Sequence, residues 1–286
     1  MAKARKVERL SLSRLIQRLD QKDPDATPED TVPTGFPSID RMLGGGLRER
    51  DLVVLGGDVG SGKSALALSI ALRAAALGHS VAFLSAEMDE DRLFERAIAI
   101  NGKIQIDQIR KGTLSEPARS QVAAEALKLQ DLPFHVLPLV GRDFDEMLEP
   151  AWEFDPQLVV IDYLQSLPSP NPKITKDEDN AATIQAIKSM VLDRHVACIL
   201  LAQLPDFDPD RPDPRPTLDD FGALGSVKQT ADLILGLFRE EMYHPGGGVE
   251  GATELHVTKN RNGPTGFVDL YFYQSWMRFE DLLDPD

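Results

Sequence analysis

The chain has 286 residues, 42% of them hydrophobic, which suffices for one large domain or one domain with an appendage. It contains no apolar run of membrane-span length and its N-terminus lacks an apolar signal region, so we expect a cytoplasmic protein without a membrane anchor. The formal net charge of −15 excludes long-range attraction of nucleic acid by the whole body, so any DNA contact requires a local basic lining.

The first 32 residues differ from the rest. Residues 1–22 hold seven basic and two acidic side chains, and the remainder holds 24 basic and 44 acidic ones, a charge of −20. Residues 7–19 have an amphipathic helical pattern, and the acidic, proline-rich residues 20–33 have the composition of a linker. The helix either packs on its own domain or is an arm that docks on a neighbouring subunit. We therefore divide the chain into an arm and linker, 1–32, and one large domain, 33–286.

A phosphate-binding loop follows the apolar strand predicted at 52–55. Residues 57–64 match the GxxxxGK[ST] pattern, and an alanine- and leucine-rich helix follows up to Gly78. Glycines let consecutive backbone N–H groups face a triphosphate, and Lys63 can reach its β- and γ-phosphates. The Ser64 hydroxyl is a candidate Mg²⁺ ligand. The residues predicted to bind ATP are Gly57, Gly60, Ser61, Gly62, Lys63 and Ser64.

The elements along the rest of the chain alternate between strands and helices. Predicted strands lie at 81–85, 134–137, 158–162, 196–203, 233–237, 254–259, 267–272 and 276–279. Predicted helices lie within 34–50 and at 89–99, 116–129 and 181–192, and residues 205–216 are predicted to form an exposed loop. This order indicates an α/β fold with a mostly parallel sheet, helices on both faces and antiparallel C-terminal hairpins.

Polar residues end three of the buried strands. Asp162 closes the strand at 158–162, where a carboxylate can hold Mg²⁺ or accept a hydrogen bond from the phosphate loop. Glu87 follows the strand at 81–85 and is our candidate base for the attacking water, with Glu95 on the next helix as the alternative. Gln203 ends the strand at 196–203 and is either a γ-phosphate sensor or an ordinary polar strand end.

The only cysteine, Cys198, lies in an apolar run and is expected to be a buried thiol without a disulfide or metal role, which suits a reducing cytosol.

Lys259 and Arg261 form a basic pair in a tight loop. The pair is either an exposed turn or a set of cations that reach the γ-phosphate bound by a neighbouring subunit, as an arginine finger does.

Taken together, these segments resemble the C-terminal ATPase domain of the DnaB family of hexameric replicative helicases. The DYLQ, REEMYH and KNRNGP runs are the most specific parts of the resemblance. The matching segments are, in order, TGF (34–36), the phosphate loop, SAEM (85–88), IDYLQ (161–165), AQL (202–204), QTADLI (229–234), REEMYH (239–244) and KNRNGP (259–264).

The resemblance implies a RecA-like core in a ring, hexameric in the family manner, with ATP and Mg²⁺ bound between subunits. It implies that Lys63 and Ser64 bind the phosphates and Mg²⁺, that Asp162 supports the metal and that Glu87 is the base. Gln203 would couple nucleotide state to movement, Lys259 and Arg261 would act in trans, and residues 7–19 would correspond to the family's linker helix.

Two departures from the family are visible. Only a short arm precedes the ATPase domain, which argues against coupling to a primase. The DNA-gripping loop, close to DLRESGS in the family, reads DFGALGS at 220–226, so Gly222 stands in place of the arginine and Ala223 in place of the glutamate. Lys173, Lys176 and Lys228 could compensate, and we expect weak single-strand binding.

The sequence therefore supports one main function and two alternatives. The main hypothesis is a DnaB-like helicase whose loops at 163–180 and 217–228 move along single-stranded DNA as ATP is hydrolysed. An ATP-dependent switch or assembly protein that does not separate strands is the first alternative, favoured by the acidic body and Gly222. A recombinase or circadian-clock-type relative is suggested by the PSID run at 37–40 and the triple glycine at 44–46, but the DYLQ and RNGP motifs count against it.

Overall fold

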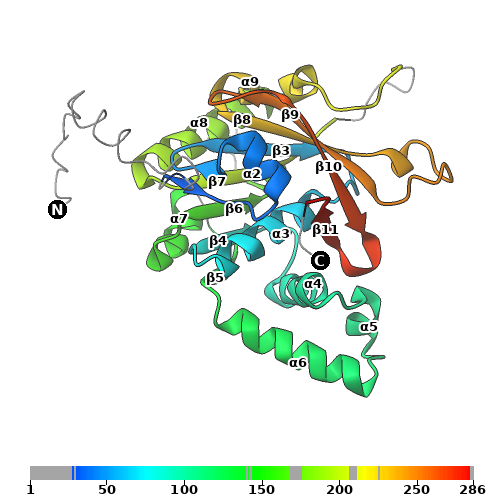
Figure 1. The fold of residues 1–286 in the computed structure, drawn as a ribbon. Helices are drawn as coiled ribbons and strands as arrows, with labels where there is room; N and C mark the ends of the chain where they lie inside the picture. The colour runs from blue at the N-terminus through cyan, green and yellow to red at the C-terminus, as the bar shows by residue number, and fades with distance from the viewer. Residues whose placement is uncertain are drawn as a thin grey trace.

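A nine-stranded sheet runs through the centre of the molecule in the order β11-β10-β9-β8-β3-β7-β6-β4-β5 (Figure 1). This computed structural model describes residues 28, 30–139, 141, 144–167, 176–205, 211–224 and 226–283. The six strands from β8 to β5 are parallel, and β9, β10 and β11 join them as antiparallel neighbours. The expected mostly parallel α/β sheet with antiparallel C-terminal strands is confirmed.

The strands and helices have the following bounds. The strands of the large sheet are β3 (Leu52–Gly57), β4 (Val81–Ser85), β5 (Phe134–Pro138), β6 (Leu158–Asp162), β7 (Ala197–Gln203), β8 (Leu233–Arg239), β9 (Ala252–Asn260), β10 (Gly266–Tyr273) and β11 (Arg278–Asp281). The α-helices are α2 (Pro37–Leu43), α3 (Lys63–Ala76), α4 (Glu90–Gly102), α5 (Ile106–Lys111), α6 (Glu116–Gln130), α7 (Phe144–Leu148), α8 (Lys176–Arg194) and α9 (Val227–Thr230).

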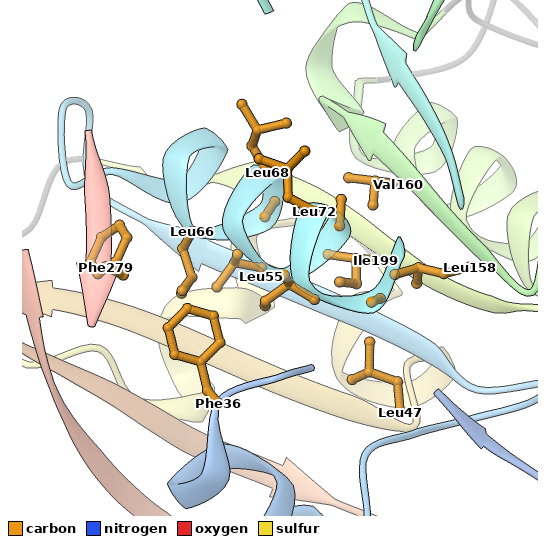
Figure 2. Packing of buried hydrophobic residues seen from close by; sticks show 14 of the residues in the cluster. Phe36, Leu47, Leu55, Leu66, Leu68, Leu72, Leu158, Val160, Ile199 and Phe279 are labelled. Atoms are coloured by element: carbon orange, nitrogen blue, oxygen red, sulfur yellow. The ribbon is translucent and has the colours of Figure 1, made fainter. Parts of the chain in front are cut away.

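Alternate residues of the central strands enter two separate cores, because successive side chains of a strand point to opposite faces of the sheet. On one face Val53 and Leu55 of β3 pack with the apolar side chains of α3, and Figure 2 shows Leu66, Leu68 and Leu72 of that helix over Leu55. On the other face Leu52 and Val54 pack with Ile184, Ile187 and Val191 of α8. Helices therefore cover both faces of the parallel strands, as predicted.

The C-terminal strands support the start of α3. Phe272 of β10 and Phe279 of β11 stack at 4.5 Å between ring centroids. The Phe279 ring lies against Gly62, where a Cβ atom would come within 3.0 Å of it and where φ is +100°, so glycine is needed for both reasons. The antiparallel hairpins thus pack directly behind the phosphate loop.

Several elements differ from the sequence prediction. The helix expected at 181–192 begins earlier, at Lys176, and the strand expected at 276–279 begins at Arg278 because residues 274–276 form the 3-10 turn η5 (Gln274–Trp276). The small sheet of β1 (Thr31–Val32) and β2 (Leu47–Arg48), and the helices α5 and α7, were not predicted. These elements are short, and pattern reasoning is weakest for short segments.

Two other expectations concern the arm and the loop at 205–216. The predicted helix at 7–19 lies outside the described residues. The loop, predicted to be exposed, is anchored where it is described: Arg215 donates to Glu254 from both Nη2 and Nε (2.6 and 2.8 Å), and Pro216 packs on Gly236. Among the described helices, none has the length and apolar character needed to cross a bilayer.

Candidate nucleotide-binding site

The predicted phosphate loop and the three polar strand ends lie on one edge of the sheet. β3, β7, β6 and β4 are parallel neighbours, so their carboxyl ends meet at the same edge. Gly57 at the end of β3 is paired in register with Gln203 at the end of β7, and Ser85 of β4 is paired with Asp162 of β6. Tertiary structure thereby gathers residues from four distant parts of the sequence.

The phosphate loop turns sharply from β3 into α3. Gly60 and Gly62 have φ values of +76° and +100°, in the left-handed region that favours glycine. The Ser61 amide donates to the Asp58 carbonyl (3.2 Å), and α3 begins at Lys63. The first backbone N–H groups of this 14-residue helix therefore face the loop, which is the arrangement that binds phosphate groups in nucleotide-binding proteins.

Lys63 is held within this loop. Its Nζ donates to the carbonyl oxygens of Gly57 (2.9 Å) and Asp58 (2.7 Å). Burial lowers the pKa of Lys63, and the negative charges of Asp58, Asp162 and Glu87 oppose that effect. The lysine is thus positioned beside the loop backbone, where it can move to a phosphate group over a short path.

Asp162 and Ser64 form a pair suited to a divalent cation. Burial raises the pKa of Asp162 to about 6, and a hydrogen bond from the Ser64 side chain opposes the rise. The Asp162 Oδ2 atom is buried and has no hydrogen-bond partner in the described part of the chain. A carboxylate and a hydroxyl oxygen are ligands that Mg²⁺ accepts, so these residues fit the predicted metal.

A pocket of about 290 Å³ connects these side chains. The residues of the sequence prediction that line it are Gly60, Gly62, Lys63, Ser64, Glu87, Asp162 and Gln203. Glu87 is exposed on its rim, two residues beyond the end of β4. The alternative base, Glu95, does not line the pocket; it lies on α4 and pairs with Arg110 (3.7 Å). The geometry therefore favours Glu87 over Glu95.

One lining residue, Arg96 of α4, has no counterpart in the sequence analysis. Burial lowers its pKa, the nearby Arg110 adds to the effect, and the carboxylates of Asp162 and Glu87 oppose it. Its Nε atom is buried without a partner among the described residues. A single arginine on a helix gives no pattern from which this placement could be read, because it depends on how α4 packs against the sheet edge.

The REEMYH segment contacts the phosphate loop of its own chain. Arg239, at the end of β8, donates from Nη1 to the carbonyl of Gly60 (3.1 Å). The Tyr243 hydroxyl donates to Asp58 Oδ2 (3.2 Å), and burial beside this carboxylate raises the pKa of Tyr243 to about 12. The sequence analysis used this segment only as evidence of the family resemblance. In the structure its side chains also bind the phosphate loop directly.

Lys259 and Arg261 lie at the other end of the sheet. Lys259 lies in strand β9, as the strand predicted at 254–259 has it, although the tight loop was expected to begin at this residue and the strand continues to Asn260; Lys259 pairs with Ile234 at the start of β8. Five residue steps along β8 separate Ile234 from Arg239 at the phosphate loop, which corresponds to about 17 Å at the usual rise of a strand. The basic pair is therefore remote from the pocket of its own chain.

Both cations are bonded to the segment around α9. Lys259 Nζ donates to the carbonyls of Lys228 (2.7 Å) and Ala231 (2.5 Å). Arg261 donates from Nη2 to the Gln229 carbonyl (2.6 Å) and from Nη1 to Asp232 Oδ1 (2.9 Å). Burial and the neighbouring Arg261 lower the pKa of Lys259.

The segment that corresponds to the family's DNA-gripping loop is in part described. Gly222 is exposed, and a Cβ atom there would meet only the Lys228 side chain, at 3.5 Å. Lys228, one of the compensating cations predicted from the sequence, forms an ion pair with the exposed Asp219 (2.6 Å). Lys173 lies outside the described residues, and the side chain of Lys176 is likewise not described.

The described residues contain no group of three or more His, Cys, Asp or Glu side chains placed to hold a metal ion. A two-oxygen set such as Ser64 and Asp162 falls below that number. Such a set is typical of Mg²⁺ bound together with nucleotide phosphates, where phosphate oxygens and water supply the remaining ligands.

Comparison with known proteins gives consistent results. A sequence model of the family described as "DnaB-like helicase C terminal domain" matches residues 31–281. The chain is 30% identical over 257 residues to the replicative DNA helicase DnaB of Leifsonia xyli subsp. xyli (strain CTCB07), covering 88% of this chain and 56% of that protein. It is 29% identical over 273 residues to the replicative DNA helicase DnaC of Bacillus subtilis (strain 168), covering 93% and 59%.

Two solved structures share the fold. A structure of a DnaB-like replicative helicase and its interactions with primase superposes with a TM-score of 0.88 at 26% identity, covering 96% of this chain and 68% of that one. A structure of a separate ATPase domain superposes with a TM-score of 0.88 at 25% identity, covering 96% of this chain and all of that one (100%). The chain thus spans little more than half the length of the two curated relatives but the whole of a solved ATPase domain.

Proposed function

Because this chain belongs to the family of DnaB-like helicase C-terminal domains, we propose that it is a ring-forming ATPase that translocates on single-stranded DNA. One observation carries the proposal. Lys63, Ser64, Glu87, Asp162 and Gln203 line one pocket, whereas Lys259 and Arg261 lie at the opposite end of the sheet. A site completed by Lys259 and Arg261 would have to use these cations from another subunit.

In this proposal the phosphate loop, residues 57–64, binds the nucleotide. The loop amides and Lys63 hold the β- and γ-phosphates of ATP, as the equivalent groups do in phosphate-loop ATPases. Ser64 and Asp162 would hold Mg²⁺. When bound, Mg²⁺ neutralises negative charge on the phosphates.

Two other residues of the pocket act on the γ-phosphate. Glu87, exposed on the rim, orients the attacking water and accepts its proton. Gln203 lies beside Gly57 at the end of β7, so its amide can sense the γ-phosphate and transmit the change along that strand. Arg96 adds positive charge on the same wall.

The neighbouring subunit supplies the cations. Lys259 and Arg261 from one protomer would reach the γ-phosphate in the pocket of the next, where an arginine stabilises the charge of the transition state. Repetition of this head-to-tail contact would close a ring, and we propose a hexamer, which the family resemblance supports. We also propose a cytoplasmic location, because the buried free thiol of Cys198 suits a reducing compartment.

Two observations on the loop at 217–228 bear on DNA binding. In place of an arginine the loop has the exposed Gly222, and Lys228 is neutralised by Asp219. These two observations favour the alternative, an ATP-dependent switch or assembly protein without strand separation. We retain the motor as the main proposal, with low affinity for single-stranded DNA that weakens as salt shields the phosphate contacts.

The ATPase rate measured with and without single-stranded DNA, over a series of salt concentrations, tests this function. We expect stimulation by DNA that decreases as salt rises, and no turnover by Lys63→Ala, which removes a phosphate ligand. An ATPase rate that does not change with DNA even at low salt would contradict the motor and favour the switch. Full turnover by a protein that stays monomeric with ATP and DNA would exclude a shared site in either case.

A further inference from the structure

We propose that Asp232 is the positioning residue for Arg261, fixing its guanidinium at the angle from which it acts on the next subunit's ATP. The proposal rests on the proposed function, since it assigns a support to the arginine that acts in trans. Asp232 lies between α9 and β8, at the end of the sheet remote from its own phosphate loop.

Asp232 holds Arg261 at two points. The Asp232 carbonyl accepts from the Arg261 backbone N–H (3.0 Å), and its Oδ1 accepts from Nη1 (2.9 Å). The Gln229 carbonyl adds a third bond, from Nη2 (2.6 Å). Both the backbone and the head of this long side chain are thereby fixed relative to α9.

The second oxygen of Asp232 is fixed to the body of the protein. Oδ2 accepts from the backbone N–H of Leu52, the first residue of β3 (2.8 Å), and from Lys188 Nζ of α8 (2.5 Å). Only 6% of the Asp232 side chain is exposed. A buried carboxylate with partners on a central strand and a helix cannot change rotamer without losing several bonds, so it is a rigid support.

Arg261 itself remains accessible. Its side chain is 48% exposed, so part of the guanidinium can meet another molecule. Within the described part of the chain two of its five N–H donors are engaged, one by Asp232 and one by Gln229. An unsupported arginine at the surface would sample many rotamers, and holding it in one lowers the entropy that must be lost when the transition state forms.

Asp232 also neutralises the half-buried Lys188, whose Nζ donates to the Arg50 carbonyl as well (2.7 Å). Removing the carboxylate therefore has two consequences: it frees Arg261, and it leaves Lys188 without its counter-charge. The second effect is purely structural and lowers stability. The release of Arg261 and the loss of the counter-charge of Lys188 can be separated experimentally, because Lys188 and Arg261 bind different oxygens of Asp232.

The test compares Asp232→Asn with the double variant Asp232→Asn, Lys188→Met. In both, the asparagine keeps an acceptor for the Leu52 N–H but lacks the charge that orients Arg261. In the double variant the uncompensated lysine is replaced by an apolar side chain of similar length. We expect Asp232→Asn to melt at lower temperature and the double variant to regain most of that loss.

Turnover should respond differently from stability. We expect kcat to fall about 100-fold in both variants, as for a small misplacement of a reacting group, while KM for ATP stays within about twofold. Asp107→Asn, which removes an exposed carboxylate paired with Lys111 on α5, is the matched control and should change neither quantity. Recovery of full kcat by the double variant would overturn the proposal, because Asp232 would then serve only Lys188.

Two further measurements distinguish this proposal from the function on which it rests. In an Arg261→Ala background, which is expected to bind ATP without turning it over, Asp232→Asn should leave the affinity for ATP unchanged, whereas weaker ATP binding would mean that Asp232 acts elsewhere. If Arg261→Ala itself hydrolyses ATP at the normal rate, both proposals are overturned. If Arg261→Ala is inactive and Asp232→Asn is fully active, only the role of Asp232 is overturned.

Discussion

Gln165 and Gln203 are joined by two hydrogen bonds that extend the pairing of β6 and β7 beyond the end of its ladder. The Gln165 side chain donates to the Gln203 carbonyl (2.9 Å) and accepts from the Gln203 backbone N–H (3.3 Å). The β6–β7 ladder itself ends at Ile161 and Leu200. Gln165, from the DYLQ run, therefore fixes the backbone of Gln203 at the pocket without using the Gln203 side chain, for which we propose the sensing role.

This link predicts a graded effect on coupling between DNA and ATP. Gln203→Ala should bind ATP normally but lose stimulation by single-stranded DNA, because the sensing amide is gone. Gln165→Ala should lose part of that stimulation, since the end of β7 becomes less constrained. The measurement is the ratio of ATPase rates with and without DNA. Gln121→Ala, which removes a comparable side chain-to-carbonyl bond on α6 (2.7 Å), is the control. Normal stimulation in Gln203→Ala would contradict the sensor role.

The shared site predicts complementation between two inactive variants. Arg261→Ala should bind ATP but not turn it over, and Glu87→Ala should do the same for lack of a base. In rings mixed at equal amounts, about a quarter of the interfaces combine an intact Glu87 with an intact Arg261, so about a quarter of the normal rate should return. The rate after mixing and re-annealing is the readout. No recovery in rings shown to contain both variants would rule out a site divided in this way.

Stability should depend on pH through Asp51. Burial, with a smaller contribution from nearby Asp232, raises the pKa of Asp51 to about 6, above its usual value of 3.8. The folded state then holds a proton that the unfolded state has released, so the free energy of unfolding falls as pH rises from about 4 to about 6. Asp51→Asn removes the part of this dependence that comes from Asp51, while Asp162, whose pKa is likewise raised to about 6, keeps its own contribution.

We expect Asp51→Asn to melt like the unmodified protein near pH 4 and at higher temperature at pH 8. The gain in unfolding free energy is of the order of 2 kcal/mol, allowing for the partial exposure of the group. Calorimetric melting of both proteins at the two pH values, without nucleotide, measures it. A gain that is the same at pH 4 and pH 8 would show that the effect does not come from titration of Asp51.

Cys198 should be unreactive in the folded protein. It is fully buried on β7, and burial raises its pKa to about 12, so almost no thiolate exists at neutral pH. A chromogenic disulfide reagent should label it only in denaturant, at the rate of an ordinary free thiol. Fast labelling under native conditions would indicate that β7 opens locally, since no other cysteine is present.

Elements with local signals could be predicted without the structure. Strand β3, the phosphate loop and the start of α3 follow one another along the chain, so residue type and spacing suffice to identify them. Asp162, Glu87 and Gln203 can be predicted as neighbours because parallel strands end at a common edge. The structure places all three in the pocket with Lys63 and Ser64.

Other contacts depend on which strands are neighbours, and no local pattern gives that order. Arg239 and Tyr243 contact the phosphate loop because β8 lies directly beside β3. About 180 residues of sequence separate these two side chains from the loop residues that they bind. Arg96 enters the pocket because of the way α4 packs against the sheet edge. A side chain that is distant in sequence from the phosphate loop reaches the site only through such packing. The residues next to it in the sequence therefore do not predict that contact.

Residue order was therefore enough to predict the phosphate loop, the polar residues at the strand ends and the presence of a basic pair. Each depends on residues close together in the chain or on the common direction of parallel strands. The position of Lys259 and Arg261 relative to the pocket could be learned only from the tertiary structure. The antiparallel return of β9 along β8 carries Lys259 and Arg261 to the end of the sheet opposite the pocket, beside Asp232. The antiparallel return of β9 follows from the hairpin connection, but the placement of β8 parallel to β3 and directly beside it is set by long-range packing. That placement puts the start of β8, and with it the basic pair, at the end of the sheet opposite the phosphate loop.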